Sequence, residues 1–416
     1  MKGSRWPLRA RVLSVAVGLG ATALASWAVA DGLSPGVPAT VVVGDPRGAA
    51  PRDRVDAHRR GRAHTLLPEA PKELWRRELA GGVVLPPVVD DRGGIVVALS
   101  SPDLVRLDED GQQTWRVRLG AAAPSVPPVI ASDGSILVVA EDGILWSVSA
   151  GGSIRFSVDL ATSTKAAGAA PLARDDGSVV VAGSQELVVV AADGSVRART
   201  AIDGRPVGGL LPHEGGVLVT TREGDVWRWT PPGSPRRMGT FGGQMTAGAS
   251  KVSSRTVVGV VERERVVGLD LVTGATTLLL SAAAFVAPLE DTVTLTPAGV
   301  LLATSVVGEV AGIDARGVLV QRGALEKVPT MFTTDAGVPP MFRRARMSSS
   351  PPLVVDPGGR VAFARNSGKI GALSSEGVVH TASPRQCARP VALLPAGKAR
   401  FVIACRSGSV AVFGDP

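Results

Sequence analysis

Cysteine and histidine are scarce in this chain of 416 residues. The sequence has two cysteines and four histidines, and only His58 and His64 lie close together among the histidines. Zinc sites need three or four ligands, usually cysteine and histidine at short, regular spacings. No stretch of the sequence offers such a spacing. We therefore expect no metal ion held by histidine and cysteine.

Charge is modest as well. Charged residues make up 20% of the chain, and the formal net charge is +8. Four of the positive charges lie in an N-terminal segment that we expect to be removed, which leaves +4 on the mature chain. Proteins that bind nucleic acid gather lysine and arginine on one face, whereas the remaining basic residues are spread along this sequence. Nucleic acid is not an expected partner.

The N-terminus has the pattern of a secretory signal peptide over residues 1–30. A basic start is followed by an apolar run at residues 12–29, and Ala28 and Ala30 provide the small side chains that precede a cleavage site. The run also reaches the lower limit of the roughly 18 to 20 residues that span a bilayer, so an uncleaved anchor is the alternative. No cysteine lies near this site, so a lipid anchor is not expected. We expect an exported monomer, periplasmic or at the cell surface, with no membrane span after cleavage.

Residues 31–71 show no hydrophobic period. Six prolines are scattered through this stretch among glycine, alanine and charges of both signs. Such a composition is typical of a flexible linker. We interpret the stretch as a tether that holds a folded domain away from a membrane or a partner; an ordinary disordered terminus is the alternative.

Repeats begin after this stretch, in a chain rich in glycine, proline and valine. Gly93, Gly134 and Gly177 each follow a proline by six positions and precede a short run of valine, isoleucine or leucine. The glycines lie 41 and 43 residues apart. Valine favours strands, and glycine and proline mark turns. A period near 40 residues with this content indicates a repeated all-β unit.

Each unit contains four short antiparallel strands, which is the content of one β-propeller blade. In the first unit we expect these strands at residues 88–90, 95–99, 104–107 and 114–119. Later units have their second strands near residues 217–220, 257–261, 300–303, 361–364 and 401–404. The sequence therefore predicts an eight-bladed β-propeller over residues 72–416. Seven blades are the alternative, because the units at residues 239–287 are the least regular.

The two ends of the repeat region complement one another. The last unit stops at Phe413 after its third strand, and the missing fourth strand appears at the N-terminal end. There, residues 75–79 match residues 115–119 of the first unit. We expect the strand around Trp75 to complete the final blade and close the ring, which removes exposed sheet edges.

The repeats resemble those of the PQQ-like propeller superfamily. In that family a glycine ends the turn before the fourth strand, and an aromatic residue four positions later docks onto the next blade. Gly111 with Trp115 and Gly152 with Phe156 keep this pattern, which is lost in later repeats such as that of Gly274. The resemblance covers residues 72–413.

The resemblance implies two different functions. Quinoprotein dehydrogenases of the superfamily bind pyrroloquinoline quinone beside a vicinal cysteine pair and a Ca²⁺ ion, and use a catalytic aspartate. This chain has no adjacent cysteines and no Cys-x-x-Cys-His haem site, so we expect no cofactor, and a quinone-dependent dehydrogenase is a remote alternative. The non-catalytic branch resembles the propeller scaffold of the outer-membrane β-barrel assembly machinery. We therefore expect a protein-binding scaffold of the cell envelope with protein partners, possessing no enzymatic activity, although the N-terminal lipid-bearing cysteine of that scaffold is missing.

The two cysteines, Cys387 and Cys405, fall in the last unit. A turn at residues 396–398 between strands at 390–394 and 400–404 would place them nearly opposite one another. In an oxidising compartment this predicts a disulfide bond, which for a loop of this size stabilises the fold by about 3 kcal/mol. A reactive thiol is the alternative.

An insertion interrupts the regular spacing at residues 324–350. It places apolar side chains beside arginines, a combination that protein-binding hot spots use. The candidate partner-binding residues are Met331, Phe332, Met341, Phe342, Arg343 and Arg344. The alternative is that the two phenylalanines only cover the propeller.

A carbohydrate-binding or carbohydrate-degrading propeller is the alternative function from another class. Such a protein would use the funnel along the propeller axis, and a glycosidase would need two or more converging carboxylates there. A closed or apolar funnel would favour the protein-binding scaffold.

Overall fold

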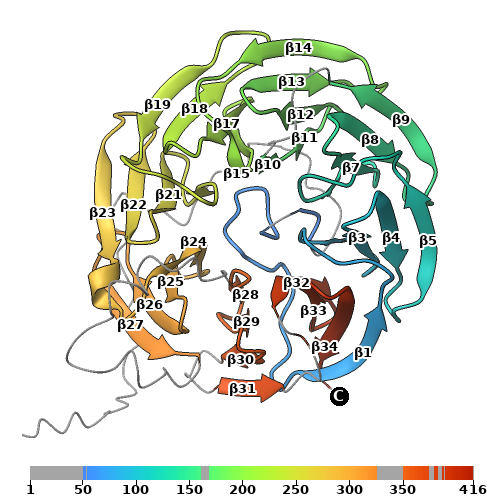
Figure 1. Cartoon of the computed structure of the whole chain (residues 1–416). Helices are drawn as coiled ribbons and strands as arrows, with labels where there is room; N and C mark the ends of the chain where they lie inside the picture. Colours follow the sequence, from blue (N-terminus) through green and yellow to red (C-terminus); the bar gives the residue numbers. More distant parts are fainter. Residues whose placement is uncertain are drawn as a thin grey trace, which may run out of the picture.

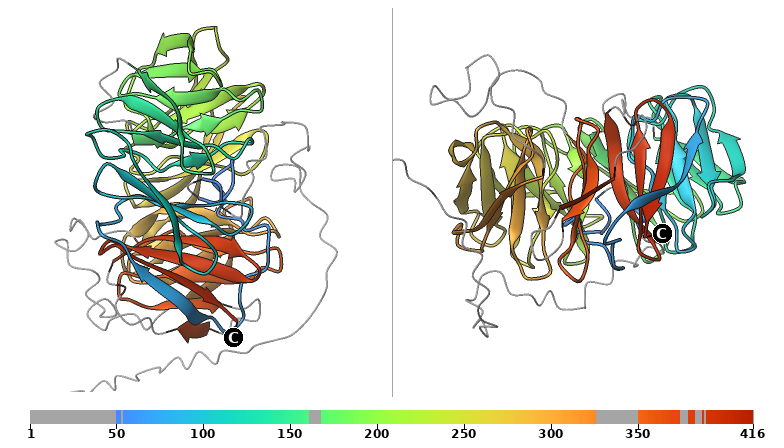
Figure 2. Two further views of the ribbon diagram at one scale, coloured as in Figure 1. Left: turned by 90° about the vertical axis from the view of Figure 1, so that its right-hand side faces the viewer. Right: turned by 90° about the horizontal axis from the view of Figure 1, so that it is seen from below.

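The computed structural model describes residues 50–52, 54–160, 168–325, 350–373, 379–382, 387 and 389–415. These residues form a closed ring of β-sheets around a central axis (Figure 1). Seen from the side, the blades stand next to one another in a flat disc (Figure 2). The expected all-β propeller is confirmed. No helix among the described residues is long and apolar enough to cross a membrane.

The described residues form eight four-stranded antiparallel sheets, so the prediction of eight blades is also confirmed. From the axis outwards, the strands are: blade 1, β2 (Val88–Val89), β3 (Ile95–Ala98), β4 (Asp103–Leu107) and β5 (Gln113–Arg118); blade 2, β6 (Val129–Ile130), β7 (Ile136–Val139), β8 (Ile144–Val148) and β9 (Ile154–Asp159); blade 3, β11 (Leu172–Ala173), β12 (Val179–Ala182), β13 (Glu186–Val190) and β14 (Val196–Ala201); blade 4, β16 (Leu211–His213), β17 (Gly216–Thr220), β18 (Asp225–Trp229) and β19 (Arg236–Thr240); blade 5, β20 (Ser250–Lys251), β21 (Thr256–Val261), β22 (Arg265–Asp270) and β23 (Thr276–Ser281); blade 6, β24 (Leu289–Leu295), β25 (Leu301–Ser305), β26 (Glu309–Ile313) and β27 (Leu319–Ala324); blade 7, β28 (Val354–Val355), β29 (Val361–Ala364), β30 (Ile370–Leu373) and β31 (Val379–Ala382); blade 8, β32 (Pro390–Gly397), β33 (Arg400–Cys405), β34 (Ser409–Gly414) and β1 (Lys72–Glu78). A short parallel pair, β10 (Gly168–Ala170) with β15 (Val207–Gly209), joins blades 3 and 4.

Burial changes from the second strand of a blade to its fourth. Every residue of β3, β7 and β12 is buried, because a neighbouring blade covers each face of these strands. The outer strands β5, β9 and β14 instead alternate between half-buried and exposed residues. This gradient explains why unbroken runs of valine and isoleucine recur in the sequence about once per 40 residues.

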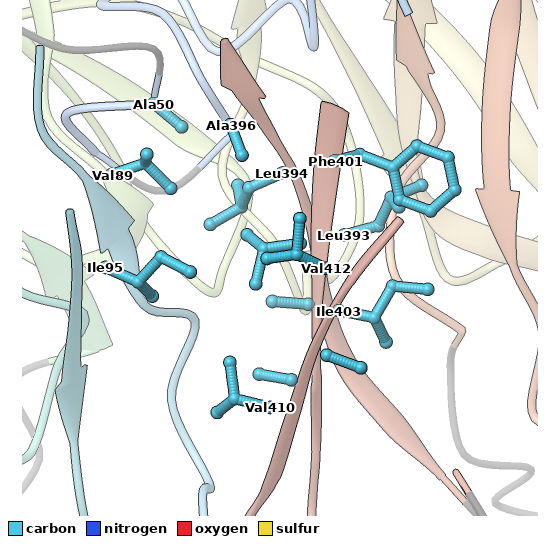
Figure 3. Packing of buried hydrophobic residues seen from close by; sticks show 14 of the residues in the cluster. Ala50, Val89, Ile95, Leu393, Leu394, Ala396, Phe401, Ile403, Val410 and Val412 are labelled. Carbon is cyan, nitrogen blue, oxygen red and sulfur yellow. The ribbon is translucent and has the colours of Figure 1, made fainter. Parts of the chain in front are cut away.

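The N-terminal strand closes the ring, as predicted. β1 pairs antiparallel with β34, with Trp75 opposite Val412 and Arg76 opposite Ala411. The hydrophobic cluster at this junction joins β2 and β3 of blade 1 to the strands of blade 8 (Figure 3). Both chain ends thus contribute to one sheet, and no blade in the described ring is left without its fourth strand.

Aromatic side chains of the outer strands dock onto the next blade. The ring of Trp75 lies against Gly111 of blade 1, and its Nε1 donates a hydrogen bond to the carbonyl of Glu109 at 2.8 Å. Trp115 lies against Gly152 of blade 2 in the same way. A glycine is needed beneath the ring because a side chain would occupy the space of the indole.

Replacing Gly111 by alanine is expected to lower the free energy of unfolding by about 2 to 3 kcal/mol. A Cβ atom there would lie 2.7 Å from Trp75, at a residue with a φ of +79°. Gly134→Ala is the matched control, because Gly134 has a φ of +82° but its Cβ would meet no atom closer than 4.0 Å. We expect the control to cost about 1 kcal/mol in urea unfolding. Equal losses of unfolding free energy in the two variants would show that the indole of Trp75 does not require glycine at position 111.

Candidate functional site

The axis of the propeller is occupied by the chain itself. Residues 50–52 and 54–67, which we call the channel segment, run through the centre of the ring (blue in Figure 1). The expectation of a flexible tether over residues 31–71 is therefore wrong for residues 50–52 and 54–71, whereas residues 1–49, with the expected signal peptide, and residue 53 lie outside the described part. The segment has no hydrophobic period because it forms no sheet of its own. Its partners are the innermost strands of the blades.

Backbone hydrogen bonds hold the channel segment to five blades. The N–H groups of Val89 in β2, Ile130 in β6, Lys251 in β20, Leu295 in β24 and Val355 in β28 donate to its carbonyls. The N···O distances lie between 2.8 and 2.9 Å. A segment bonded to blades 1, 2, 5, 6 and 7 links parts of the ring that are far apart in sequence.

Asp56 sets the path of the channel segment. Its buried carboxylate accepts hydrogen bonds from the backbone N–H groups of His58, Arg60 and Arg62 at 2.8, 3.2 and 3.3 Å. Arg60 also donates from Nε at 3.3 Å. One carboxylate thus satisfies three donors of a tight turn that has no helix or sheet to pair with.

The wall of the channel is shaped to receive Arg59. A Cβ atom on Gly209 of β15 would lie 2.6 Å from Nη1 of this buried arginine, so a larger residue there would force the guanidinium to move. On the other side, the hydroxyl of Ser250 donates to the carbonyl of Arg59 at 2.7 Å. Between the segment and blades 7 and 8 a cavity of about 20 Å³ remains, which is room for about one water molecule.

Electrostatics in the channel favours neutral histidines. Burial, assisted by the positive charges of Arg60 and Lys251, lowers the pKa of His58 to about 4. Burial and Lys251 likewise lower the pKa of His213 to about 4. Burial also lowers the pKa of Lys251 to about 8, although its Nζ donates to the carbonyl of Pro212 at 3.0 Å. Each added proton in this basic channel therefore meets like charge.

Acidification is expected to destabilise the propeller through these histidines. The pKa of His213 is about 4 in the folded state and 6.5 ordinarily. The stability that depends on its neutral form is therefore fully present above pH 6.5 and is lost as the pH falls towards 4. The full loss amounts to about 3 kcal/mol. His213→Gln should therefore flatten the decline in unfolding free energy between pH 7 and pH 4.5. His380→Gln, on the outer strand β31, is the control, and equal slopes in the two variants would contradict the prediction.

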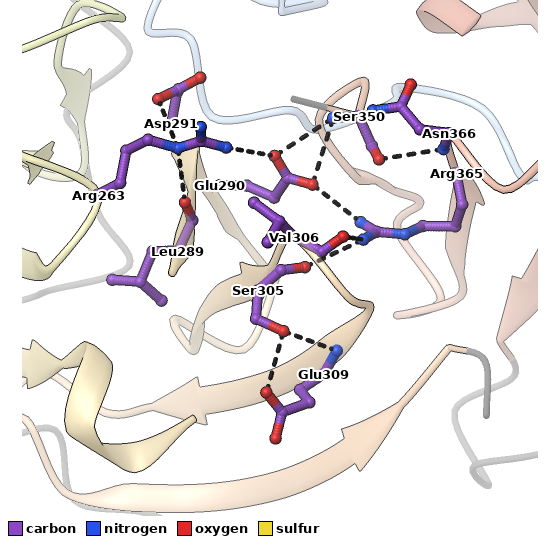
Figure 4. A network of polar contacts seen from close by, with 10 residues as sticks. All are labelled: Arg263, Leu289, Glu290, Asp291, Ser305, Val306, Glu309, Ser350, Arg365 and Asn366. Atoms are coloured by element: carbon purple, nitrogen blue, oxygen red, sulfur yellow. Dashed lines mark hydrogen bonds and ion pairs between the residues drawn. The ribbon is translucent and has the colours of Figure 1, made fainter. Parts of the chain in front are cut away.

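A buried ionic network fixes blades 5, 6 and 7 to one another (Figure 4). The carboxylate of Glu290 in β24 lies 3.2 Å from Nη1 of Arg365 and 3.6 Å from Nη2 of Arg263. It also accepts the N–H of Ser350 at 3.2 Å. Burial raises the pKa of Glu290, and the two arginines oppose this rise. Arg365 donates in addition to the carbonyls of Ser305 and Val306, so the network has a structural role.

The described part of the chain contains no group of three or more histidine, cysteine or acidic residues that could hold a metal ion. In the channel, the carboxylate of Asp56 is used by the backbone of the channel segment, and that of Glu290 by two arginines. The space in which an axial ligand of a propeller would bind is taken by the channel segment.

The outer strands differ in charge around the ring. Those of blades 8 and 1 to 4 each have at least two charged residues, as in β14 with Arg197 and Arg199. β23 of blade 5 has none, and β27 of blade 6 has only Arg322. β31 of blade 7 likewise has no acidic or basic residue apart from His380. Charges on edge strands prevent pairing with other chains, so blades 5 and 6 lack a protection that blades 8 and 1 to 4 have.

Large apolar side chains are exposed where these charges are missing. We call the group the apolar outer surface; it comprises Val272, Leu278, Val318, Leu319 and Val320, each 45 to 68% exposed. A Cβ atom on Gly317, next to Val318, would lie within 3.5 Å of Leu279, so the turn before β27 touches β23 and the two parts adjoin. Contiguous exposed apolar side chains mark sites of protein interaction.

A groove of about 310 Å³ lies between blades 6 and 7 and reaches β27 at Gln321, next to Val320. Gln321 lies four residues after Gly317, the position that Trp115 holds after Gly111, so this junction lacks the docking aromatic. The walls are mainly apolar and include Leu325 and Leu353. The groove is thus an effect of the degenerate repeat.

The partner-binding residues expected from the sequence, Met331, Phe332, Met341, Phe342, Arg343 and Arg344, lie outside the described residues. The apolar outer surface, part of which lies directly before that insertion, was not predicted from the sequence. Its signal is present in the sequence as the absence of charge from residues 276–281 and 317–321. That signal acquires meaning only once these residues are known to form outer strands.

The predicted disulfide joins Cys387 and Cys405, with their Cα atoms 5.6 Å apart. The expected hairpin register is wrong, however. The structure pairs Phe401 with Pro395, whereas a turn at residues 396–398 would pair it with Ala392. The turn is tighter and lies later, because Lys398 and Ala399 both adopt positive φ angles.

Sequence and structure comparisons agree with the propeller. A model of the family described as outer membrane protein assembly factor BamB matches residues 59–209, which is less than half of the chain. The chain resembles the PQQ-like propellers. BamB from Moraxella catarrhalis is similar in structure, with a TM-score of 0.51 and 15% identity over 80% of this chain and 85% of that chain. No curated protein matches the sequence.

Other propellers are also similar in structure. The computationally designed protein Ika8 has a TM-score of 0.62 and 15% identity over 85% of this chain and 100% of that chain. A virginiamycin B lyase from Staphylococcus aureus has a TM-score of 0.50 and 12% identity over 82% of this chain and 99% of that chain. At such identities the PQQ-like propellers and these proteins share the fold with this chain, and the structures by themselves assign no activity.

Proposed function

We propose that this protein is an exported, non-catalytic scaffold that binds other proteins in the cell envelope through the apolar outer surface of blades 5 and 6. The observation that carries the proposal is the exposure of Leu278, Leu319 and Val320 on outer strands that have at most one charge, whereas those of blades 8 and 1 to 4 have two or more. The match to the family described as an outer membrane protein assembly factor supports a role in the assembly of outer membrane proteins.

The filled axis favours this proposal over a carbohydrate-binding propeller. An axial sugar site would require removal of the channel segment, which is hydrogen-bonded to five blades. The described carboxylates near the axis are already engaged with backbone N–H groups or arginines. The outer surface, in contrast, is available without any rearrangement of the described residues.

Site-specific crosslinking tests the proposal. A photoreactive amino acid at Val320 should capture a defined envelope protein in intact cells, whereas the same residue at Arg118, on the outer strand of blade 1, should not. Leu278→Asp should reduce the yield at position 320 at least tenfold, because a buried unpaired carboxylate costs more than the roughly 1.4 kcal/mol that a factor of ten represents. Equal capture at both positions would contradict the proposal.

A further inference from the structure

We propose that the partner binds blade 6 as an added β-strand, through the free backbone edge of β27, and that this strand is apolar with an acidic residue that faces Arg322. This inference rests on the proposed function and specifies how its surface is used. Side chains alone could hold a partner in any conformation. Pairing with the backbone of β27 requires the partner to be extended.

The direction of the backbone groups of β27 follows from one hydrogen bond. The N–H of Leu325 donates to the carbonyl of Gly308 at 2.8 Å, so this residue faces β26. In an antiparallel pair, residues that face the neighbouring strand alternate with residues that face away. The N–H and C=O groups of Arg322 and Ala324 therefore point to the open side of the sheet, where no described strand pairs with them.

All six residues of β27 are exposed. Leu319 and Val320 are 45 and 53% exposed, and a strand added beside them would bury these side chains as well as pair the backbone. Main-chain hydrogen bonds with alternate side-chain contacts are the elements of strand-addition complexes. β27 offers free backbone groups and exposed apolar side chains, and it has a single charged residue, Arg322.

The charges around this edge select the partner. Arg322 lies within the strand and Arg316 in the preceding turn, and their side chains are 57 and 70% exposed. Arg322 donates to the carbonyl of Ala284 at 2.8 Å, and its Nη2 lies 3.8 Å from the carboxylate of Glu309. Arg316 is instead paired with Asp314 of its own turn at 2.9 Å, so Arg322 is the more loosely paired of the two charges. A strand with a carboxylate opposite Arg322 gains a favourable cross-strand pair. A second copy of this chain is less suitable, because antiparallel pairing of two β27 strands centred on Arg322 would place like charges directly opposite each other. The surface therefore fits an acidic, apolar strand of another protein.

Proline at the free edge provides a test. Ala324→Pro removes one outward N–H of β27 and leaves the bonds to β26 intact, since edge strands tolerate proline on the open side. Ala201→Pro in β14 is the matched control: Ala201 pairs with Glu186 as Ala324 pairs with Glu309, and the N–H of the next residue, Ile202, likewise donates inwards, to Gln185. Circular dichroism would establish that both variants fold.

The probe is a fluorescein-labelled synthetic peptide of alternating valine and threonine with a central aspartate, measured by fluorescence anisotropy with the full chain. We expect Ala324→Pro to weaken binding at least tenfold and Ala201→Pro to leave it unchanged. A peptide methylated on alternate backbone nitrogens keeps its side chains, and it should bind wild-type protein at least tenfold more weakly in one of its two methylation patterns. A central lysine in place of aspartate should weaken binding as well.

The outcomes separate this inference from the proposed function. If crosslinking at position 320 captures a partner but methylation and Ala324→Pro have no effect on peptide binding, the strand-addition model is overturned and the scaffold function stands. A chain that is dimeric in light scattering and becomes monomeric on Ala324→Pro would also overturn it, because a second copy would then occupy the edge. Failure of the crosslinking experiment itself would remove the proposed function.

Discussion

Asp56→Ala is expected to lower the free energy of unfolding by about 3 to 5 kcal/mol. The substitution leaves the backbone N–H groups of His58, Arg60 and Arg62 without their acceptor in the centre of the ring. A buried donor that loses its partner costs about 1 to 3 kcal/mol. Urea unfolding measures the loss, and trypsin provides a second readout, because the segment has arginine cleavage sites that its burial protects.

A turn aspartate on the surface provides the control for Asp56. Asp108 also accepts two backbone hydrogen bonds, from Asp110 and Gln112, but these lie in an exposed turn where water can replace the carboxylate. Asp108→Ala should therefore cost about 1 kcal/mol and leave trypsin cleavage of the channel segment unchanged. If Asp56→Ala costs no more than Asp108→Ala and residues 50–67 stay resistant to trypsin, the segment does not depend on this carboxylate.

The difference between the blades and the channel segment shows what the sequence can predict. The second strand of blade 3, Val179–Ala182, is visible in the sequence because each of its residues is buried between sheets, and the turn before it requires Gly177. Ring closure by β1 was equally accessible, because Trp75 repeats the position of Trp115. These features follow from local pattern and from a period near 40 residues.

The channel segment was not accessible in the same way. Val55, Ala63 and Leu67 are buried, but their spacing follows neither a helix nor a strand. Each is covered by blades that lie far away in sequence, and the polar groups around Asp56 are satisfied only by the fold of the segment within the ring. Proline, arginine and glycine therefore gave residues 50–67 the composition of a linker, whereas the tertiary structure gives them an ordered position.

The cysteine pair falls between these two cases. Its pairing could be predicted because a hairpin brings Cys387 and Cys405 close in any of several registers, and a Cα separation of 5.6 Å suits a disulfide. The register could not be predicted, since Lys398 and Ala399 adopt a left-handed turn conformation that usually calls for asparagine or glycine. A long-range contact can thus be correct while the strand pairing that led to it is shifted.

Glu290→Ala is the second large effect, with an expected loss of about 3 to 5 kcal/mol in the free energy of unfolding. The substitution leaves Arg365, whose side chain is 2% exposed, without its counter-charge, and it removes the acceptor of the Ser350 N–H. Breaking a buried ion pair on one side is costly because the remaining charge stays desolvated. The carbonyls of Ser305 and Val306 still accept from Arg365, but they bring no negative charge.

Three variants determine whether charge is the cause. Glu290→Gln keeps the shape and an acceptor for Ser350, so a loss close to that of alanine would assign the effect to the missing charge. In Glu290→Ala combined with Arg365→Met, no arginine remains unpaired at that position, and the double variant should be more stable than the sum of the single losses predicts. Glu186→Ala breaks the half-exposed pair with Arg199 and should cost at most about 1 kcal/mol. A loss for Glu290→Ala as small as that for Glu186→Ala would mean that the blades hold together without the network.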